Sequence, residues 1–384
     1  MDVQSRRELG PSLGRLVLLS YYNPYPSDRI HHFCTSLWYL LILEQFQHMG
    51  ILDCAEAWFV SDRPMEFVKH GVTVRCFESF EAMADHKAET DVLWVRGKCR
   101  AYAPVLNRLA ARLRVYYPAS KRFLSQDWNH FDVVLVDDAR QVGPVARLAR
   151  GRSVARVIKT ADPDVFRPIA GVEKVHDICM IGGMHIVRKN FDALIRLLAG
   201  APSLSAVIIG KQESKTFEKL VATGARIRFI DFCGRDELNL VMNQSRVGFV
   251  PNLMDAAPRV ILEFMSAGVP VLLNADILGG RDYITPRTGV LAKESEFPEV
   301  ARRMCGGEIS LDARGGFEAH FSPDKAAQHL GAILTHTMRH LRRNRPERPP
   351  GLLRRLVSRP LLYRRKLWRC WQEIVSGDSL APQP

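Results

Sequence analysis

Short apolar runs alternate with longer amphipathic stretches along the first part of the chain. The runs are rich in β-branched and aromatic residues and are bounded by turn-forming residues, which is typical of buried β-strands. Helices are predicted between several of them. Such an alternation predicts a parallel sheet with helices on its faces. The predicted strands are Arg15–Ser20, Ala57–Ser61, Val72–Phe77, Asp91–Val95, Leu113–Tyr117 and Phe131–Val136, and the predicted helices are Ser36–His48 and Pro104–Leu113.

A second series of the same kind follows a break at residues 159–177, which hold two prolines and an uneven charge pattern. We therefore predict an α/β protein with two doubly wound domains, residues 1–166 and 167–322. A helix over residues 323–341 is expected to return to the first domain, and residues 342–384 form a tail. The second series comprises strands at Asp177–Ile181, Ser205–Ile209, Ile227–Ile230, Val247–Val250 and Val269–Leu273, and helices at Asn190–Ala199, Glu237–Gln244 and Pro258–Ala267.

Length and composition agree with two globular domains. The chain has 384 residues, of which 47% are apolar and 25% charged. The longest wholly apolar run, Leu37–Leu43, is far shorter than the roughly 20 residues that a membrane-spanning helix needs. The first residues lack the apolar core of a secretion signal, and the eight cysteines are scattered without a C-x-x-C pair. These features predict a cytoplasmic protein with reduced thiols.

Positive charge is concentrated at the C-terminal end. Residues 341–384 carry +8 of the net charge of +13, with ten arginines and one lysine against three acids. Arginine interleaved with Trp and Tyr suits an anionic membrane surface, where each basic residue is worth about 1 kcal/mol. We therefore expect residues 342–375 to associate peripherally with the inner face of a membrane. The alternative is a solvated extension. No nucleic-acid partner is expected, because nothing else in the chain is suited to reading bases.

A carboxylate inside an apolar helix distinguishes the segment Val250–Gly268, VPNLMDAAPRVILEFMSAG. Pro258 suits the first turn of that helix, and Glu263 follows among apolar neighbours. A carboxylate in such surroundings is costly unless it is paired or faces a cleft. Two interpretations are open: Glu263 forms an ion pair with Arg259 on an exposed stripe, or it lines a ligand site.

A strand that runs into two glycines and then a basic pair distinguishes the segment Ile178–Asn190, ICMIGGMHIVRKN. Gly182 and Gly183 would let the backbone approach a ligand closely. Arg188 and Lys189 stand just before a predicted helix. The alternative is a strand, turn and helix with a solvated basic pair.

Together these segments resemble the C-terminal domain of GT-B-fold glycosyltransferases, and most closely the retaining family 4, glycosyl transferases group 1. That fold has two Rossmann-like domains that face each other across a cleft. The family's E-x7-E element corresponds to Asp255 and Glu263, with Asp in place of the first Glu. Gly183 stands where the family usually has Arg. The similarity extends through AGVPVLL (267–273), GGRDYITPRTGVLA (279–292) and the linker-like ADPDVFRP (161–168).

The resemblance implies a donor site for a nucleoside diphosphate sugar on the second domain, with no cofactor and no obligatory metal. Glu263 would accept hydrogen bonds from the ribose, and Asp255 would lie near the transferred sugar as a catalytic residue. Arg188 and Lys189 would neutralise the diphosphate as its charge develops. The backbone of Ala256–Arg259, at a helix N-terminus, would favour the anion. The further residues implied at the donor site are Gly182, Gly183, Gly210, Ala257, Pro258, Arg259, Phe232 and Cys233, of which the last two would lie near the base.

The acceptor side offers one candidate loop. Residues 21–32 follow the first predicted strand and carry His31 and His32 side by side. Loops at the carboxyl ends of parallel strands line the ligand crevice of open α/β sheets. The two histidines are therefore acceptor-side candidates, with a helix-start or surface role as the alternative.

Two pairs of aspartates resemble the D-x-D metal site of another glycosyltransferase fold. They are Asp162 with Asp164, and Asp137 with Asp138. Because no compact cluster with metal-ligand spacing accompanies them, we interpret them as surface or turn carboxylates and predict no metal site.

The sequence thus predicts a glycosyltransferase that moves a sugar, with retention, from a nucleoside diphosphate sugar to a glycan or lipid-linked acceptor in cell-envelope polysaccharide or glycolipid synthesis. Two alternatives from other classes stay open. Asp255 and Gly183, which depart from the family pattern, also suit a GT-B protein that has lost catalysis and acts as a binding or scaffold module. A nucleotide-sugar epimerase of the same fold is the other alternative.

Overall fold

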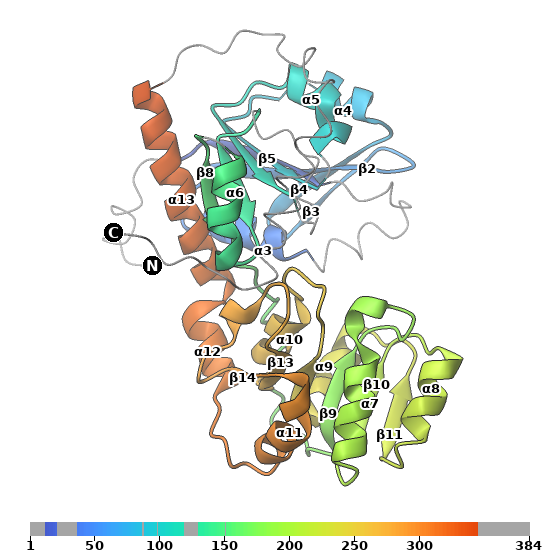
Figure 1. Cartoon of the computed structure of the whole chain (residues 1–384). Helices are drawn as coiled ribbons and strands as arrows, with labels where there is room; N and C mark the ends of the chain where they lie inside the picture. Colours follow the sequence, from blue (N-terminus) through green and yellow to red (C-terminus); the bar gives the residue numbers. More distant parts are fainter. Residues whose placement is uncertain are drawn as a thin grey trace, which may run out of the picture. The chain divides into compact units, whose positions relative to one another are not determined.

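The computed structural model describes residues 12–20, 37–86, 88–97, 99–118, 130–149 and 151–344. They form two compact units, each built on one mainly parallel sheet (Figure 1). The first unit comprises the described residues up to Ile158 together with those from Ala326 onwards, and the second comprises Lys159–Lys325. The predicted α/β class with two doubly wound sheets is confirmed.

The first unit has an eight-stranded sheet. Its strands are β1 (Arg15–Ser20), β2 (Cys54–Val60), β3 (Met65–Lys69), β4 (Val72–Phe77), β5 (Val92–Arg96), β6 (Leu113–Tyr117), β7 (Val133–Val136) and β8 (Ser153–Arg156). They lie in the order β3-β4-β2-β1-β5-β6-β7-β8, and β3 pairs antiparallel with β4 whereas the other neighbours are parallel. The order reverses direction between β1 and β5, so this point is a topological switch.

Helices cover both faces of this sheet. On one face lie α3 (Trp38–His48) and α13 (Pro323–Asn344), and on the other lie α4 (Phe80–Asp85), α5 (Ala103–Arg108) and α6 (Val142–Leu148). The short turns η1 (Cys99–Tyr102) and η4 (Ala139–Gln141) precede α5 and α6. Successive side chains of a strand point to opposite faces, so Leu16 and Leu18 of β1 pack toward α3, and Val17 and Leu19 pack toward the other helices. This continuous burial explains why the central strands are mainly apolar.

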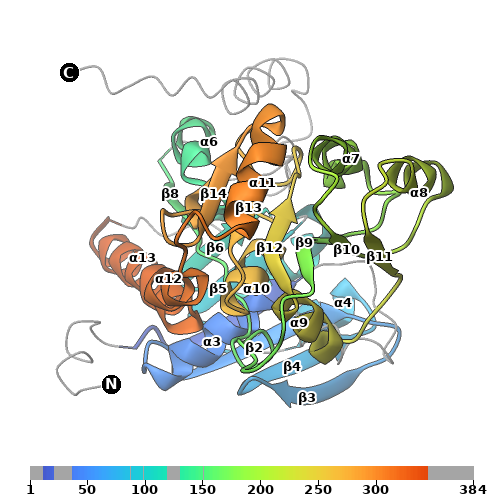
Figure 2. The same cartoon turned by 90° about the horizontal axis from the view of Figure 1, so that it is seen from below.

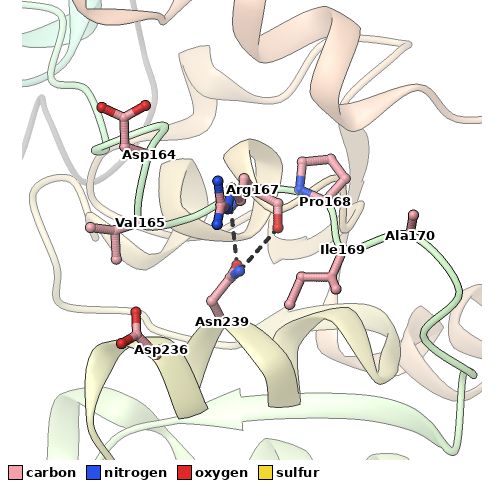
Figure 3. A pocket seen from close by; sticks show the side chains of 8 residues that line it. All are labelled: Asp164, Val165, Arg167, Pro168, Ile169, Ala170, Asp236 and Asn239. Carbon is pink, nitrogen blue, oxygen red and sulfur yellow. Dashed lines mark hydrogen bonds between the residues drawn. The ribbon is translucent and has the colours of Figure 1, made fainter.

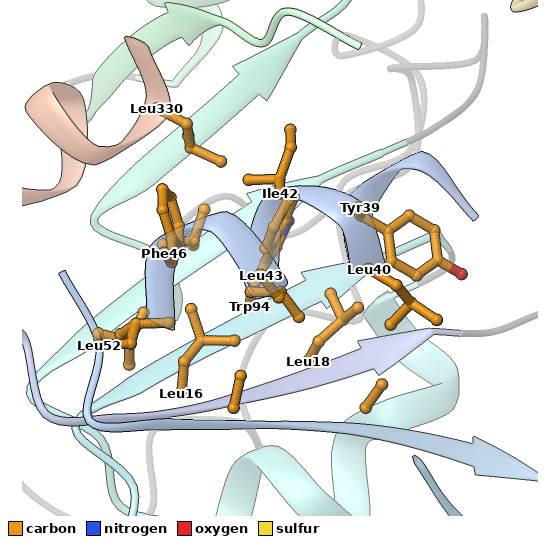
Figure 4. Close-up of a cluster of buried hydrophobic side chains, with 14 of the residues drawn as sticks. Leu16, Leu18, Tyr39, Leu40, Ile42, Leu43, Phe46, Leu52, Trp94 and Leu330 are labelled. Carbon is orange, nitrogen blue, oxygen red and sulfur yellow. The ribbon is translucent and has the colours of Figure 1, made fainter. Parts of the chain in front are cut away.

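The core under α3 joins segments that are far apart in the chain. Figure 4 shows Leu16 and Leu18 below Ile42 and Phe46 of α3, with Leu330 of α13 on the same side. The residues of α13 that enter this core recur every three or four positions, as one face of a helix requires: Ala326, Ala327, Leu330, Leu334 and Met338. From Ala326 onwards α13 therefore stabilises the first unit, although it begins in the second.

The second unit has a six-stranded sheet in which every neighbouring pair is parallel. Its strands are β9 (His176–Ile181), β10 (Ala206–Ile209), β11 (Ile227–Ile230), β12 (Ser245–Val250), β13 (Val271–Asn274) and β14 (Gly289–Ala292). They lie in the order β11-β10-β9-β12-β13-β14. The chain builds outward from β9 in one direction and then continues from β12 in the other. Ligands bind at such switch points, outside the carboxyl ends of the strands.

Six helices of the second unit divide between the faces of its sheet (Figure 2). One face carries α7 (Phe191–Gly200), α8 (Ser214–Val221) and α11 (Phe297–Cys305); the other carries α9 (Arg235–Asn243), α10 (Val260–Ser266) and α12 (Ala313–His320). Three short turns lie in the connections, namely η5 (Val187–Lys189), η6 (Arg281–Tyr283) and η7 (Glu294–Glu296). On the first of these faces, Leu194 of α7 and Phe297 of α11 are buried against the sheet.

The prediction missed the short edge strand β3. Its sequence MEFVK mixes charged and apolar residues, and Val68 within it is 66% exposed. An edge strand packs on fewer neighbours than a central one, so its apolar signal is weak. His70 and Gly71, both with positive φ, form the tight turn to β4. The predicted helix Pro104–Leu113 was too long, because α5 ends at Arg108 before β6 begins.

The last described helix extends into the segment that was predicted as a basic tail. Helix α13 continues to Asn344, three residues into the segment that was predicted as the tail. Residues 345–384 lie outside the described residues, so their association with a membrane stays a prediction. In the part of the chain that is described, no helix is both long and apolar enough to cross a membrane.

Candidate functional site

The predicted site residues follow four neighbouring strands of the second unit. Gly182 comes directly after β9, Gly210 after β10, Phe232 shortly after β11, and Asp255 lies in the loop after β12. These strands are adjacent in the order β11-β10-β9-β12. Since their carboxyl ends share one edge of the sheet, the four loops converge beside the switch point, where open α/β sheets bind ligands.

Two glycines bring the first loops into direct contact. A Cβ at Gly210 would lie 2.5 Å from the carbonyl carbon of Gly182, and a Cβ at Gly182 would lie 2.5 Å from Cε of Lys189. Both glycines have positive φ, +149° at Gly182 and +143° at Gly210, which other residues rarely adopt. Glycine is therefore required at both positions, and the aliphatic stem of Lys189 lies against the backbone of Gly182.

Gly183 is buried beside a histidine ring. A Cβ at this position would lie 2.6 Å from Cε1 of His185. The side chain that the resembled family usually carries here would therefore displace His185. His185 is exposed and can move, so nothing in the structure requires glycine at this position.

Lys189 lies in a group of four charges. It is the last residue of η5, and the charges near it are those of Asp255, Glu263 and Arg188. Burial lowers the pKa of Lys189, the two carboxylates oppose that shift, and Arg188 adds to it. Among the described residues, the Lys189 ammonium makes no direct ion pair or hydrogen bond. An anion placed here would favour the ammonium form and offset the cost of its burial.

The loop that carries Asp255 is held by contacts on both sides. Asp255 is half-buried and accepts a hydrogen bond from Nδ2 of the buried Asn252 at 3.2 Å. Nζ of Lys159 donates to the carbonyl oxygen of Ala257 at 3.1 Å. A Cβ at Gly279 would lie 1.8 Å from the carbonyl oxygen of Ala256, so the neighbouring loop packs directly onto this one. The orientation of the loop is therefore set by its surroundings.

The helix after this loop differs from the prediction at its start. Arg259 is the N-cap of α10 and Pro258 lies before it, so Pro258 is buried ahead of the first turn rather than in it. The helix has only seven residues. The amides of Ala256–Arg259 belong to the packed loop, and any affinity of these amides for an anion stays a prediction.

Glu263 lies between two cations. It is half-buried on α10, near Lys189 and also near Arg235, the first residue of α9. Burial lowers the pKa of Arg235, and the carboxylates of Glu263 and Asp162 oppose this; a guanidinium stays charged in any case. The Arg235 guanidinium also lies over the ring of Phe166, 5.7 Å from its centre. Glu263 is therefore not part of an exposed stripe, and Arg259 beside it is the exposed residue.

The remaining predicted residues fall into two groups. Phe232 is 83% exposed, and Cys233 is half-buried with a thiol whose pKa is raised by burial. Both lie in the loop between β11 and α9. His31 and His32, the acceptor-side candidates, lie outside the described residues.

The aspartates that were predicted as surface or turn carboxylates lie in turns, and three of the four are buried. Asp162 is buried and accepts a hydrogen bond from the backbone N–H of Asp164 at 3.1 Å. Asp137 accepts one from the Tyr117 hydroxyl at 2.5 Å, and Asp138 caps η4. Asp137, Asp138 and Asp162 are thus turn carboxylates inside the units rather than on their surface. Where side chains are described, no group of three or more His, Cys, Asp or Glu could hold a metal ion.

Sequence reasoning missed the residues that hold these loops. The side-chain amides of Asn190 and Asn274 and the ammonium of Lys159 donate to backbone carbonyl groups at least 23 residues away, and the amide of Asn252 donates to Asp255 within the same loop. A lone Asn carries no periodic signal. The one available hint was Asn190 directly after a basic pair at a predicted helix start, a place where Asn often adopts positive φ.

A shallow hollow of about 430 Å³ lies elsewhere on the second unit (Figure 3). It is bordered by the segment around Arg167 and by Asp236 and Asn239 of α9. The Asn239 amide both donates to and accepts from the backbone of Arg167, at 3.1 Å in each direction. None of the predicted site residues lines this hollow.

Comparison with known proteins agrees with this geometry. Residues 165–304 match the family model described as Glycosyl transferases group 1. The chain is 28% identical over 127 residues to the lipopolysaccharide glucosyltransferase WaaG of Escherichia coli K12, over 32% of this chain and 34% of that protein. The match thus spans about a third of the length of that curated relative.

Solved structures resemble a much larger part of the chain. Sucrose-phosphate synthase from Thermosynechococcus elongatus matches with a TM-score of 0.63 at 15% identity, over 85% of this chain and 100% of that one. HepE from Anabaena, in complex with UDP and glucose, matches with a TM-score of 0.58 at 14% identity, over 84% and 99%. At these identities the likeness concerns the fold. The chain has the GT-B fold that glycosyltransferases share, and its residues 165–304 match the model of the family Glycosyl transferases group 1.

Proposed function

We propose that the protein is a glycosyltransferase that takes a sugar from a nucleoside diphosphate sugar and transfers it, with retention, to a glycan or lipid-linked acceptor. One observation carries the proposal. Lys189 and Glu263 are half-buried charges at the switch point of the second unit, and neither side chain has a direct partner among the described residues. A charge in such a place is costly in free energy unless a ligand pairs with it.

The chemistry of a nucleoside diphosphate sugar fits these charges. When the bond between the anomeric carbon and the β-phosphate oxygen breaks, negative charge grows on the diphosphate. Lys189 and Arg188 would stabilise that charge, which is the place where fixed cations lower a barrier most. Glu263 would accept hydrogen bonds from the ribose hydroxyls. Asp255, held by Asn252, would lie beside the sugar that is transferred.

An exposed ring on a neighbouring loop suits the nucleobase of the donor. Phe232 offers an exposed ring after β11, on the far side of Gly210 from the charged group. A flat ring can stack on a nucleobase. HepE in complex with UDP and glucose suggests that uridine nucleotides be tested first. The match to a lipopolysaccharide glucosyltransferase supports an acceptor in the cell envelope.

Thermal unfolding with nucleotides tests the donor site. The protein would be heated alone and with UDP, GDP, ADP or CMP. A ligand that binds only the folded state stabilises it by about 2.7 kcal/mol at a hundredfold excess over its dissociation constant. We expect one nucleotide to raise the melting temperature and Glu263→Ala to remove that rise while leaving the protein folded.

Glu299→Ala is the matched control. Glu299 is an exposed carboxylate on α11 that pairs with Arg302, outside the proposed site. It should keep the full nucleotide response. If the wild-type protein responds to none of the nucleotides, the donor-site proposal is wrong and the scaffold-module alternative is favoured. In a transfer assay, Glu263→Ala should lose activity by about tenfold to a hundredfold, because a charged hydrogen-bond acceptor is removed.

A further inference from the structure

Asn190 has an unusual backbone conformation next to the proposed diphosphate site. It directly follows Lys189, and its φ of +54° and ψ of +56° place it in the left-handed region. Asn enters this region more readily than most residues, but the conformation is sparsely populated outside glycine. Such residues persist where the surrounding structure holds them, often at functional sites.

The side chain of Asn190 does not cap the helix that follows it, although Asn at a helix start usually does. Asn190 is the N-cap of α7, yet its side chain accepts no capping hydrogen bond from that helix. Instead Nδ2 donates to the carbonyl oxygen of Pro251 at 3.1 Å and to Oε1 of Glu294 at 2.7 Å. These partners lie 61 and 104 residues further along the chain. Both hydrogens of the amide are therefore used to join separate loops.

The joined loops are the two that carry the charges of the site. Pro251 begins the loop that leads to Asp255, and its carbonyl oxygen also accepts from Nδ2 of Asn274 at 3.2 Å. Lys189 is bonded through the chain to Asn190. Fixing Asn190 to Pro251 therefore fixes the backbone of the cation against the backbone of the acid-bearing loop.

We propose that Asn190 is a positioning residue that sets the Lys189 ammonium against the diphosphate of the donor. This inference rests on the proposed function. Asn190 itself does not touch the ligand in this account. It acts by holding the start of α7 against the end of β12. A displacement of about 1 Å at a charged group can cost up to a hundredfold in rate. The loss of the two hydrogen bonds of Asn190 should therefore lower the rate by more than the energy of the bonds alone would.

The test compares two ligands that differ only in the diphosphate. Calorimetric titration would measure the affinities of UDP and uridine for the wild-type protein and for Asn190→Gly, which retains the backbone conformation and removes the amide. We expect the affinity for UDP to fall about tenfold and the affinity for uridine to stay unchanged, because uridine has no phosphate for Lys189 to meet. Equal losses for both ligands would show a general structural role and overturn the inference.

A double-mutant cycle makes the test sharper. If Asn190 acts through Lys189, then Asn190→Gly should cost nothing further in a Lys189→Met background, whereas independent roles would give additive losses. Additive losses would overturn the inference and leave the proposed function standing. If wild-type protein binds UDP no more tightly than uridine, the proposed function fails and the inference fails with it.

Glu294 provides a second variant and a matched control. Glu294→Ala removes one acceptor of the Asn190 amide without changing residue 190, and should lower the affinity for UDP about threefold, again with no change for uridine. Glu294 also pairs with Arg196 of α7. Arg196→Ala removes that ion pair alone and should leave both affinities unchanged. A loss in Arg196→Ala equal to that in Glu294→Ala would assign the effect to the ion pair and overturn the inference.

Discussion

Each unit of the molecule buries a carboxylate among cations. The two groups differ in whether side chains of the protein form hydrogen bonds and ion pairs with these charges. In the first unit Glu56 is 6% exposed, accepts a hydrogen bond from Nε1 of Trp58 at 2.6 Å, and pairs with Arg15 and Arg75. Burial would raise the pKa of Glu56, but the hydrogen bonds from Trp58 and Arg15 and the nearby cations lower it overall. This group is closed, since the protein itself supplies its partners.

In the second unit the corresponding group is open. Lys189, Asp255 and Glu263 lie near one another, but among the described residues the one side-chain hydrogen bond or ion pair of these three is that of Asp255 with Asn252. A closed group stabilises the fold, because each charge loses water and gains a partner. In an open group, charges lose water without gaining a protein partner, and a ligand can supply that partner. Burial of a charge alone therefore does not mark a functional site, whereas burial of a charge that lacks protein partners does.

Lys189→Met should produce the largest effect, because it removes the cation of the open group. We expect transfer to fall by about a hundredfold to a thousandfold, as for loss of one stabilising donor at a developing charge. The melting temperature of the free protein should not fall, since replacing a buried charge by an apolar side chain of similar length is often neutral. A variant that kept transfer within a factor of two would show that this group is not the donor site.

The pH dependence of UDP binding tests whether the Lys189 ammonium binds the diphosphate. The ammonium form of Lys189 binds the diphosphate, and burial holds its pKa below the usual 10.5. The affinity for UDP should therefore fall as the pH rises through this lowered pKa, earlier than an ordinary lysine would allow. Lys189→Arg keeps its charge throughout this range, so its affinity should stay flat where that of the wild type falls. Parallel pH profiles for the two proteins would contradict this role of Lys189.

Gly210→Ala should have an intermediate effect that acts through the geometry of the open group. The new Cβ would lie 2.5 Å from the backbone of Gly182, and the φ of +143° is unfavourable for alanine. We expect a loss of about 2–3 kcal/mol in the free energy of unfolding, measured by denaturant titration, with weaker UDP binding because Lys189 rests on Gly182. Gly224→Ala is the control for backbone strain alone, since a Cβ there would meet nothing within 4 Å. Equal costs in the two variants would assign the effect to φ rather than to the contact.

Glu56→Gln should have the smallest effect and should spare ligand binding altogether. It keeps the shape of the side chain but removes the charge that meets Arg15 and Arg75, so we expect a loss of about 1–2 kcal/mol in the free energy of unfolding at neutral pH. Because the pKa of Glu56 is lower in the folded state, its contribution is present above the unfolded value near 4.5 and is lost as the pH falls through the folded value. Wild type and variant should therefore converge in acid. A change in UDP affinity would contradict the separation of the two groups.

Much of the fold could be predicted because parallel strands buried on both faces are apolar throughout. Strand β7, VVLV, is buried at every position, and β1 was predicted with its observed bounds. The edge strand β11 was also predicted, because its sequence IRFI has only one polar residue. The strands that escaped prediction lie at sheet edges: β3 and β8 in the first unit and β14 in the second. An edge strand has one neighbour and more solvent, so polar residues enter it, as in MEFVK of β3 and SVAR of β8. Strand β14, GVLA, is apolar but only four residues long.

Part of the candidate site could be predicted in the same way. The spacing of Asp255 and Glu263 and the glycines before Lys189 are local features, so a single segment of sequence displays each of them. Their roles remain proposals. Arg235 beside Glu263 and the amide of Asn190 were not assigned to a site from the sequence, because no local pattern says which distant residue a side chain will meet.

The periodicity of neighbouring residues therefore predicts most strands of the two sheets, six of the helices that cover them (α3, α5, α7, α9, α10 and α13) and the carboxylate inside an apolar helix. It did not reveal α4, α6, α8, α11 and α12. Only the tertiary structure decided that Asn190 would bridge to Pro251 and Glu294, and that Glu56 would be closed by its partners while Lys189 would not. The physical reason is that strand order, and not distance along the chain, decides which carboxyl ends meet at one edge of a sheet.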